Sequence, residues 1–149
     1  MKWKIYLSGE IHTDWRNDLI KECNELDLPV EFFSAVTDHH KSDHCGVDIL
    51  GPEEKGFWKD NKGARINALR TRVLIEKSDI LVVRFGDKYK QWNAAFDAGF
   101  ANAKNIPVIV QHSPDLTHAL KEVDAFAYAV TENNKQIAQI ISYISEKQS

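Results

Sequence analysis

Residues 80–83 read Ile80-Leu81-Val82-Val83, a run that is apolar throughout and leads into a polar loop over residues 86–92. A strand that is apolar on both faces is typical of the centre of a parallel sheet, where helices cover each side. A segment of helical length follows from Asn93 to Lys104, and the next apolar run is Pro107-Val108-Ile109-Val110. This succession predicts a strand–helix–strand unit in the middle of an α/β domain.

Strand and helix alternate about five times when the pattern is extended outward from this unit. Further strands are predicted at Ile5-Tyr6-Leu7, Val30–Phe33 and Phe126–Val130, and a short helix near Leu116 to Val123. Apolar residues at helical spacing predict three more helices, with the stripes Trp15, Leu19, Cys23 and Leu26; Ile66, Leu69 and Val73; and Ile137, Ile140, Ile141 and Ile144. The polar stretch from Ser34 to Gly63 shows neither the helical nor the strand periodicity of apolar residues, and it is interpreted as a long structureless connection.

The predicted fold is a flavodoxin-like, Rossmann-like three-layer sandwich, with a five-stranded parallel sheet in the order 2-1-3-4-5 and one domain over residues 1–149. In that order the switch point lies between the first and third strands, where open α/β sheets bind ligands beyond the strand carboxyl ends. The loops Ser8–Thr13 and Gly86–Asn93 should therefore line a pocket. No Gly-x-Gly-x-x-Gly follows the first strand, and no cofactor is expected.

Composition narrows the classes of partner. A net charge of −3 argues against binding polymeric nucleic acid, which requires a basic surface. No apolar run approaches the roughly 18 residues of a membrane helix, so no membrane partner is expected. Two cysteines do not make a secreted disulfide framework, and no signal-peptide pattern is present, so a cytoplasmic location is expected.

Asp97 is the strongest candidate for chemistry. Asn93 is expected to N-cap the helix that contains it, and Asp97 then lies one turn further along, among small residues that allow close approach of a ligand. Near the positive helix end the carboxylate should stay ionised and face the pocket. The alternative is that Asp97 only complements the helix dipole or faces solvent. Trp92 is expected in the core, although it could also stack on a base.

Other polar residues allow more than one interpretation. Lys88, Lys90, Arg84, Arg70 and Arg72 could bind a 5′-phosphate, but Lys88 and Lys90 are equally compatible with a solvated loop. The segment 38–48 is dense in His, Asp and Cys yet lacks regular zinc spacing, so no metal site is expected. An ordinary polar loop, an active-site lid and a subunit contact all remain compatible with it.

Several motifs resemble those of known families. Tyr6-Leu7-Ser8-Gly9, the run 78–83, Phe96-Asp97-Ala98-Gly99-Phe100-Ala101 and Ile106-Pro107-Val108-Ile109 are similar to the pattern of nucleoside 2-deoxyribosyltransferases. Most of the chain resembles the YtoQ branch of that superfamily still more closely, through Phe57-Trp58-Lys59-Asp60, Arg70-Thr71-Arg72 and the run 87–93.

The resemblance implies roles for individual residues. Asp97 matches the nucleophilic glutamate of the transferases, and Tyr6 matches the tyrosine that orients it. Ser8, Gly9, Asp87, Lys88, Trp92 and Asn93 are then expected to contact the substrate. The sequence departs from the pattern in having aspartate for glutamate, and in placing Thr71 and Gln91 where the family has acids. The base therefore needs another proton donor, for which Asp14, His12, Asp38 and Asp48 are candidates.

The functional prediction is transfer or hydrolysis at the N-glycosidic bond of a nucleoside or nucleotide, assisted by a carboxylate. The second hypothesis is a non-catalytic nucleotide-binding or sensing module of the same fold, and a flavodoxin-like partner protein is a weaker third. The expected partner is a small nucleoside or nucleotide. The resemblance also implies a homo-oligomer, with the segment Ser34–Gly63 folded over the pocket or against another subunit.

Overall fold

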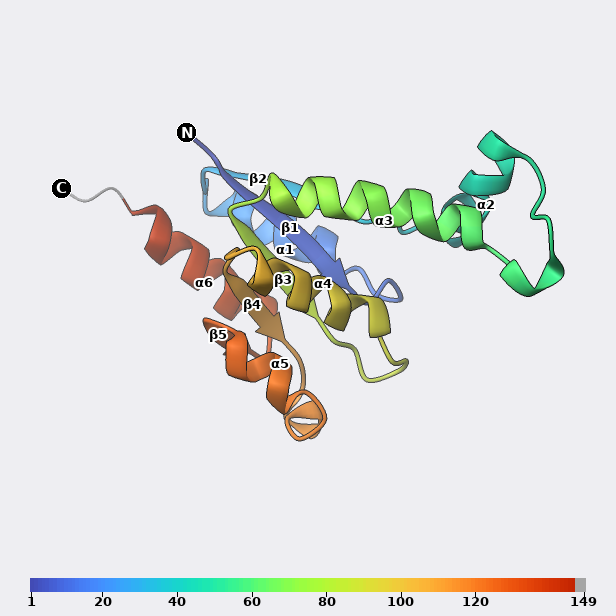
Figure 1. The fold of residues 1–149 in the computed structure, drawn as a ribbon. Coiled ribbons are helices and arrows are strands. Elements are labelled where there is room, and N and C mark those ends of the chain that lie inside the picture. Colours follow the sequence, from blue (N-terminus) through green and yellow to red (C-terminus); the bar gives the residue numbers. More distant parts are fainter. Residues whose placement is uncertain (147–149) are drawn as a thin grey trace.

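A computed structural model describes residues 1–146, apart from the side chain of Trp58 (Figure 1). Its strands are β1 (Trp3–Gly9), β2 (Val30–Ser34), β3 (Ile80–Arg84), β4 (Val108–Gln111) and β5 (Ala129–Thr131). Its α-helices are α1 (Trp15–Glu25), α2 (His39–Leu50), α3 (Asn61–Glu76), α4 (Trp92–Ala103), α5 (Lys121–Phe126) and α6 (Asn134–Ser145). Two short 3₁₀ helices, η1 (Gly56–Trp58) and η2 (Pro114–Leu116), complete the elements.

The five strands are all parallel and lie in the order β2-β1-β3-β4-β5, which confirms the predicted topology. β1 is flanked by β2 on one side and by β3 on the other, so successive strands are added in opposite directions across the sheet from this pair. The switch point therefore lies between β1 and β3. In register, Leu7 pairs with Val82 and Gly9 pairs with Arg84. The loops that follow β1 and β3 therefore leave the sheet side by side at its carboxyl edge, where the switch-point argument places a ligand.

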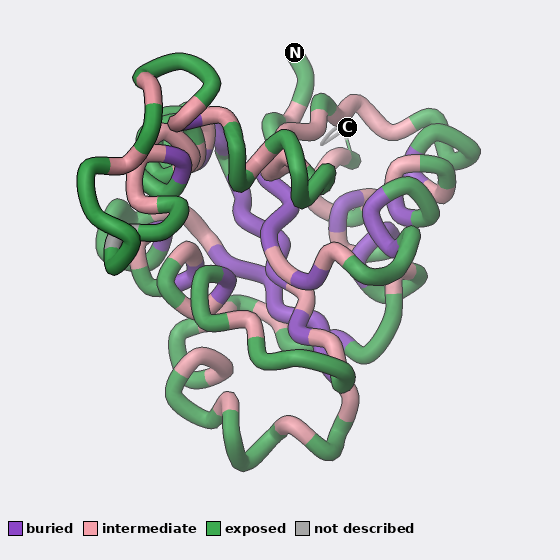
Figure 2. Tube along the Cα trace, turned by 90° about the vertical axis from the view of Figure 1, so that its right-hand side faces the viewer, coloured by how far each residue is buried: buried purple, intermediate pink, exposed green. Residues whose placement is uncertain are grey.

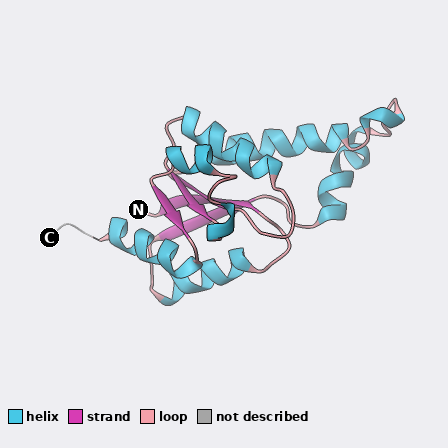
Figure 3. Ribbon diagram, turned by 90° about the horizontal axis from the view of Figure 1, so that it is seen from below, coloured by secondary structure: helices cyan, strands magenta, loops and turns pink. Residues whose placement is uncertain are grey.

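Helices cover both faces of the sheet, as Figure 3 shows. Side chains alternate along each strand, so Leu7, Val82 and Ile109 face α1 and α6, whereas Tyr6, Val83 and Val110 face the other side. On that second side they form a core with Ile75 of α3 and three alanines of α4, Ala94, Ala98 and Ala101. The apolar stripe of α6 is confirmed, because Ile137 and Ile141 are fully buried. Figure 2 shows this buried centre along the strands and a largely exposed periphery.

The segment Ser34–Gly63 is not the structureless connection that the sequence predicts. It contains α2 and η1, and together with the first turns of α3 it forms an arm that reaches beyond the sheet (Figure 1). Asp38 begins α2 by accepting a hydrogen bond from the Lys41 backbone nitrogen. Helical period is weak here because α2 packs against one helix alone, so only a narrow part of its surface must be apolar.

Two glycines let α2 and α3 cross closely. A Cβ atom on Gly46 would lie 2.2 Å from the backbone nitrogen of Gly63, and one on Gly63 would lie 2.8 Å from the Asp43 carbonyl oxygen. Asn67 then ties the two helices together by donating to the Ser42 carbonyl oxygen at 2.9 Å. The arm is therefore held by backbone contact and hydrogen bonding more than by an apolar core.

Three further expectations are wrong in detail. Asn93 does not cap α4, because the helix begins one residue earlier and Gln91 occupies the N-cap position. The predicted apolar face of α3 is mostly exposed, with Leu69 and Val73 in solvent, since the outer part of that helix extends past the sheet. Trp92 is 73% exposed and lies outside the core.

Candidate functional site

A cavity of about 610 Å³ opens at the carboxyl edge of the sheet, between α3 and α4. Such a volume falls in the range of roughly 300–1,000 Å³ that holds small-molecule ligands. Its floor is Ser8 and Gly9 at the end of β1, and its walls include Thr71 on α3 and Asp97 on α4. The arm contributes a further side, because α2 residues His39, Ser42 and Asp43 also line the cavity.

Gly9 is required where β1 ends. Its φ of +123° lies in the region that side chains disfavour, and a Cβ atom there would lie 2.0 Å from the Arg84 carbonyl oxygen. β1 and β3 thus approach each other so closely that no side chain fits between them. The chain can then turn beneath the cavity without filling it.

Ser8 and Asp97 meet on this floor. The Ser8 hydroxyl donates to Asp97 Oδ2 at 2.7 Å, and Ser8 itself is 2% exposed. Burial raises the pKa of the Asp97 carboxyl from 3.8 to about 6, although the Ser8 hydrogen bond favours the ionised form. Asp97 is therefore harder to ionise than an ordinary aspartate, although a pKa of about 6 still leaves it mostly ionised at neutral pH. A carboxyl group with a pKa near neutrality in a cavity is a candidate for catalysis.

Tyr6 lies directly beneath this pair. Its side chain is fully buried, and its hydroxyl oxygen has no hydrogen-bond partner in the part of the chain that the structure describes. Burial raises the pKa of the Tyr6 hydroxyl, the nearby Thr71 side chain opposes that rise, and the Asp97 charge adds to it. Tyr6 is thus a neutral donor close to the carboxylate, held just under the cavity surface.

The walls bring charges of both signs to the cavity. Arg70 donates to the Ser34 carbonyl oxygen at 2.7 Å, and the Arg72 guanidinium lies over the rings of Phe96 and Phe100. Lys90 lies over the Trp92 ring at 5.4 Å. Asp43 and Asp60 face the same space from the arm. The cavity walls therefore carry both basic side chains and carboxylates.

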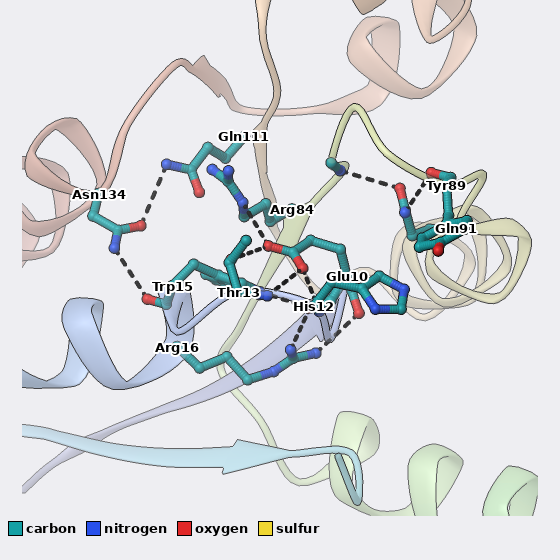
Figure 4. Close-up of polar contacts among 12 residues, drawn as sticks. Glu10, His12, Thr13, Trp15, Arg16, Arg84, Tyr89, Gln91, Gln111 and Asn134 are labelled. Carbon is teal, nitrogen blue, oxygen red and sulfur yellow. Dashed lines mark hydrogen bonds and ion pairs between the residues drawn. The ribbon is translucent and has the colours of Figure 1, made fainter. Parts of the chain in front are cut away.

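Glu10 organises the loop after β1, a role that no motif in the sequence indicates. Its carboxylate accepts from the backbone nitrogen of His12 at 2.7 Å, from both the backbone nitrogen and the hydroxyl of Thr13, and from Arg84 Nε at 3.1 Å (Figure 4). Burial alone would raise the pKa of Glu10, but these hydrogen bonds outweigh it and lower the pKa. The Glu10 backbone oxygen also accepts from Trp15 and Arg16.

The structure brings together most, but not all, of the predicted site residues. Ser8, Gly9, Trp92, Asn93 and Asp97 line the cavity, and Tyr6 lies under it. Asp87 and Lys88 do not line it. Asp87 accepts from the Ser113 hydroxyl at 2.7 Å, and the Lys88 amine lies over the Tyr89 ring.

The candidate proton donors also need revision. Asp14, Asp38, Asp48 and His12 do not line the cavity, and the His12 ring stacks on His39 and lies tilted against Tyr89. The structure places three other groups in the cavity wall, namely His39, Asp43 and Asp60. The sequence indicates only the segment Ser34–Gly63 that contains them, because their individual positions depend on how the arm folds back along α3.

Two structural features are absent among residues 1–146. No group of three or more His, Cys, Asp or Glu side chains is arranged there to hold a metal ion. The described helices include none that is long and apolar enough to cross a membrane.

Three solved structures share this fold. A conserved protein from Enterococcus faecalis V583 matches with a TM-score of 0.62 and 16% identity, over 97% of this chain and 99% of that one. A 2-deoxyribosyltransferase from Bacillus psychrosaccharolyticus matches with a TM-score of 0.53 and 18% identity, over 91% of this chain and 90% of that one. DNA processing protein A from Helicobacter pylori matches with a TM-score of 0.55 and 14% identity, over 97% of this chain and 82% of that one. That protein is described with a single-stranded DNA binding mode.

The fold and cavity thus define a Rossmann-like α/β protein with a ligand pocket at the switch point. A family model described as "Nucleoside 2-deoxyribosyltransferase YtoQ" matches residues 6–145. The chain is also 39% identical to the uncharacterized protein YtoQ of Bacillus subtilis (strain 168), over 98% of this chain and 99% of that protein. The chain therefore belongs to the YtoQ family of nucleoside 2-deoxyribosyltransferases, as its motifs suggested.

Proposed function

We propose that this protein breaks the N-glycosidic bond of a nucleoside or nucleotide and passes the sugar to water or to a second base. The observation that carries the proposal is Asp97, a half-buried carboxyl group with a pKa of about 6 at the base of a 610 Å³ cavity. A carboxylate in that position can form a bond to the anomeric carbon, or stabilise positive charge on it.

The proposed reaction proceeds in two stages. In the first, the bond between C1′ and the base nitrogen breaks, its electron pair leaves with the base, and Asp97 bonds to or stabilises C1′. The departing nitrogen takes a proton from a cavity acid, for which His39, Asp43 and Asp60 are the candidates. In the second stage, water or another base attacks C1′, releases Asp97 and gives up a proton to the same acid.

Each neighbour of Asp97 has a part in this scheme. Ser8 holds Oδ2, so Oδ1 is the oxygen that faces C1′. Tyr6 places a neutral, buried hydroxyl near the carboxylate, to which it forms no hydrogen bond in the described part of the chain. Trp92 and Asn93 line the entrance and are assigned to substrate binding, with Gly9 on the floor. Asp87 and Lys88 lie outside the cavity and have no part in this proposal.

The name of the family and the activity of the Bacillus psychrosaccharolyticus protein support a small nucleoside-like substrate. The resemblance to DNA processing protein A is one of fold, and a net charge of −3 argues against the broadly basic surface that a polynucleotide requires. Arg70, Arg72 and Lys90 in the cavity walls favour a 5′-nucleotide over an uncharged nucleoside.

Asp97→Asn tests the proposal directly. The purified protein is incubated with a panel of nucleosides and 5′-nucleotides, with and without a second base, and the products are separated by chromatography. We expect turnover in the parent and a loss of roughly a hundredfold or more in kcat for Asp97→Asn, with KM little changed. Asn102→Asp on the exposed side of α4 is the matched control, and it should leave kcat unaltered.

One observation favours the alternative of a non-catalytic nucleotide-binding module. Thr71 and Gln91 line the cavity where the transferase pattern has acids, so the family's usual acid groups are absent at those positions. A parent that binds a nucleotide without converting any panel member would establish the binding module. Parent activity that Asp97→Asn leaves intact would contradict Asp97 as the catalytic carboxylate.

A further inference from the structure

A second cavity lies at the same edge of the sheet but on its opposite face. Arg84 of β3 pairs in register with Gln111 of β4. Because side chains alternate, both follow Val82 and Ile109 onto the face covered by α1 and α6, away from Asp97. The cavity there has a volume of about 730 Å³, and Arg84 and Gln111 line it together with residues of α1 and of the start of α6.

Gln111 is the most informative residue in this cavity. It is 1% exposed, and its Nε2 donates to Asn134 Oδ1 at 3.3 Å. Asn134 Nδ2 in turn donates to the Trp15 carbonyl oxygen at 3.0 Å (Figure 4). A backbone carbonyl can only accept, so Asn134 must present its amino group to Trp15 and its oxygen to Gln111. This chain of donors determines the orientation of the Gln111 amide.

The consequence is a buried acceptor without a donor. Gln111 Oε1 has no hydrogen-bond partner in the described part of the chain, and in Figure 4 it points away from Asn134 into the space beside Arg84. An unsatisfied buried acceptor lowers the stability of the folded state. Turning the amide over does not remove the cost, because it would set two carbonyl oxygens against each other. A ligand hydroxyl or amine would satisfy Oε1.

The same cavity presents donors to an anion. Arg84 uses Nε to bind Glu10, and its other N–H groups remain on a side chain that is 27% exposed. α6 is twelve residues long and begins at the cavity wall with Asn134 and Lys135, where the first N–H groups of a helix have no partner within the helix. The positive end of the helix dipole adds to the attraction for an anion.

The rim is mixed in charge and does not by itself select a ligand. Four acidic side chains and two lysines border the cavity, and Lys21 and Glu25 form an exposed pair across one turn of α1. Salt screens such exposed charges. Selection must therefore come from the floor, where the buried acceptor of Gln111 and the guanidinium of Arg84 lie.

We propose that this cavity is a binding site for a small hydroxylated anion, a sugar phosphate or a hydroxycarboxylate. The anionic group binds Arg84 and the N-terminus of α6, and a hydroxyl group donates to Gln111 Oε1. The site does not share a side chain with the cavity around Asp97, so it is independent of the proposed catalysis. Its ligand is defined by two features together, an anion and a neighbouring hydroxyl.

Backbone amide NMR titration of the full chain tests the proposal with three probes: ribose 5-phosphate, glycerate and inorganic phosphate. We expect saturable shifts at Gln111, Asn134 and Lys135 with ribose 5-phosphate or glycerate, and about tenfold weaker binding of inorganic phosphate, which lacks a carbon-bound hydroxyl. The tighter of the two hydroxylated probes identifies the anionic group. Asp97→Asn should retain these shifts, which separates this site from a failure of the proposed function.

Gln111→Met keeps the size of the side chain and removes the acceptor. This substitution should weaken the binding of the hydroxylated probes about tenfold and leave the binding of inorganic phosphate unchanged. Gln139→Met, on the exposed side of α6, should change the binding of neither kind of probe. Equal binding of inorganic phosphate and ribose 5-phosphate by the parent would overturn the proposal, even if Gln111→Met failed to fold. So would shifts confined to Ser8 and Asp97, no saturable shift with either hydroxylated probe, or a folded Gln111→Met that binds like the parent.

Discussion

Asp97 illustrates how one residue's properties depend on its neighbours in space. It is the sixth residue of α4, so it lies beyond the first turn, where the helix dipole acts most strongly. Ala94 and Ala98 on the same helix are buried against the sheet, which brings the α4 backbone close to β1. A short carboxyl group can then reach Ser8, but it loses water in doing so. Desolvation therefore outweighs the dipole and the hydrogen bond, and the pKa rises.

This raised pKa predicts a dependence of stability on pH. The folded state holds the Asp97 proton up to a pH of about 6, whereas an ordinary aspartate releases it near 3.8. Between those values the native state binds more protons than the unfolded chain, so the free energy of unfolding should fall as pH rises and level off above about 6. The fall is on the order of 3 kcal/mol.

Denaturant unfolding of the parent and of Asp97→Asn, at a series of pH values, measures this contribution. The variant should lack the fall and should be more stable than the parent at neutral pH. The interval from pH 4 to 7 runs from just above the lower of the two pKa values to above the higher one. If the unfolding free energies of the parent and of Asp97→Asn ran parallel over that interval, the raised pKa of Asp97 would be contradicted.

Ser8→Ala gives a separate prediction about the same group. The Ser8 hydroxyl donates to Asp97 and favours its ionised form, so its removal should raise the pKa of Asp97 further. If Asp97 acts as the ionised carboxylate, the acidic limb of kcat/KM should move to higher pH, with a smaller effect on the rate at high pH. Ser42→Ala, on the wall contributed by α2, serves as the control. An acidic limb that does not move would show that Ser8 has no electrostatic effect on Asp97.

At the scale of elements, the crossing of α2 and α3 decides whether the arm forms. Gly46 and Gly63 allow the two backbones to touch, and Asn67 bonds across the crossing. This contact places His39 and Asp43 beside the cavity. The helices alone, without such close approach, would leave that side of the cavity open.

Gly46→Ala should loosen the arm. The added Cβ atom would lie 2.2 Å from the Gly63 nitrogen and 2.3 Å from the Lys62 carbonyl carbon, and backbone atoms cannot move aside as a side chain can. We expect a loss of about 1–3 kcal/mol in unfolding free energy. Amide hydrogen exchange should also increase across α2.

The matched control is Gly99→Ala. Gly99 lies within α4, and no described atom is within 4 Å of its added Cβ, so the substitution should stabilise the helix by about 0.5–1 kcal/mol. Thermal unfolding of the two variants compares them. A Gly46→Ala variant as stable as the parent would mean that the crossing is not tight in solution.

At the scale of the whole molecule, the arm exposes apolar side chains that a single copy does not cover. Ile49 and Leu50 on α2 and Leu69 on α3 are each more than half exposed. Leu50 and Leu69 also line a hollow of about 580 Å³ on the outer part of the arm. Large exposed apolar groups gathered on one projecting element are typical of a surface that meets a partner.

We therefore expect the protein to self-associate through the arm. Sedimentation velocity should show a species larger than the monomer, and Leu69→Lys should shift it toward the monomer by introducing a charge in the contact. Leu26→Lys, at an exposed leucine just after α1, should leave the amount of the larger species unchanged. A strict monomer at the highest attainable concentration would contradict this expectation.

Much of this architecture follows from short-range patterns in the sequence. The apolar run 80–83, the other strand runs and the stripe of α6 are local features, and the parallel order 2-1-3-4-5 follows from their alternation with helices. The short motifs spread over the chain, with Phe57-Trp58-Lys59-Asp60 and the run 87–93 among them, likewise indicated the family that the comparisons then established. Such patterns depend only on residues a few positions apart, so they can be recognised without a structure.

The tertiary structure alone decided what surrounds these elements. Asp43 and Asp60 line the cavity because α2 folds back on α3. The Gln111 Oε1 atom receives no hydrogen bond because the Asn134 amino group donates to the Trp15 carbonyl oxygen instead. The ionisation of Asp97 depends on burial by segments far from it in the sequence. Desolvation and hydrogen-bond geometry are properties of groups that meet in space, and no local period of the sequence records which groups will meet.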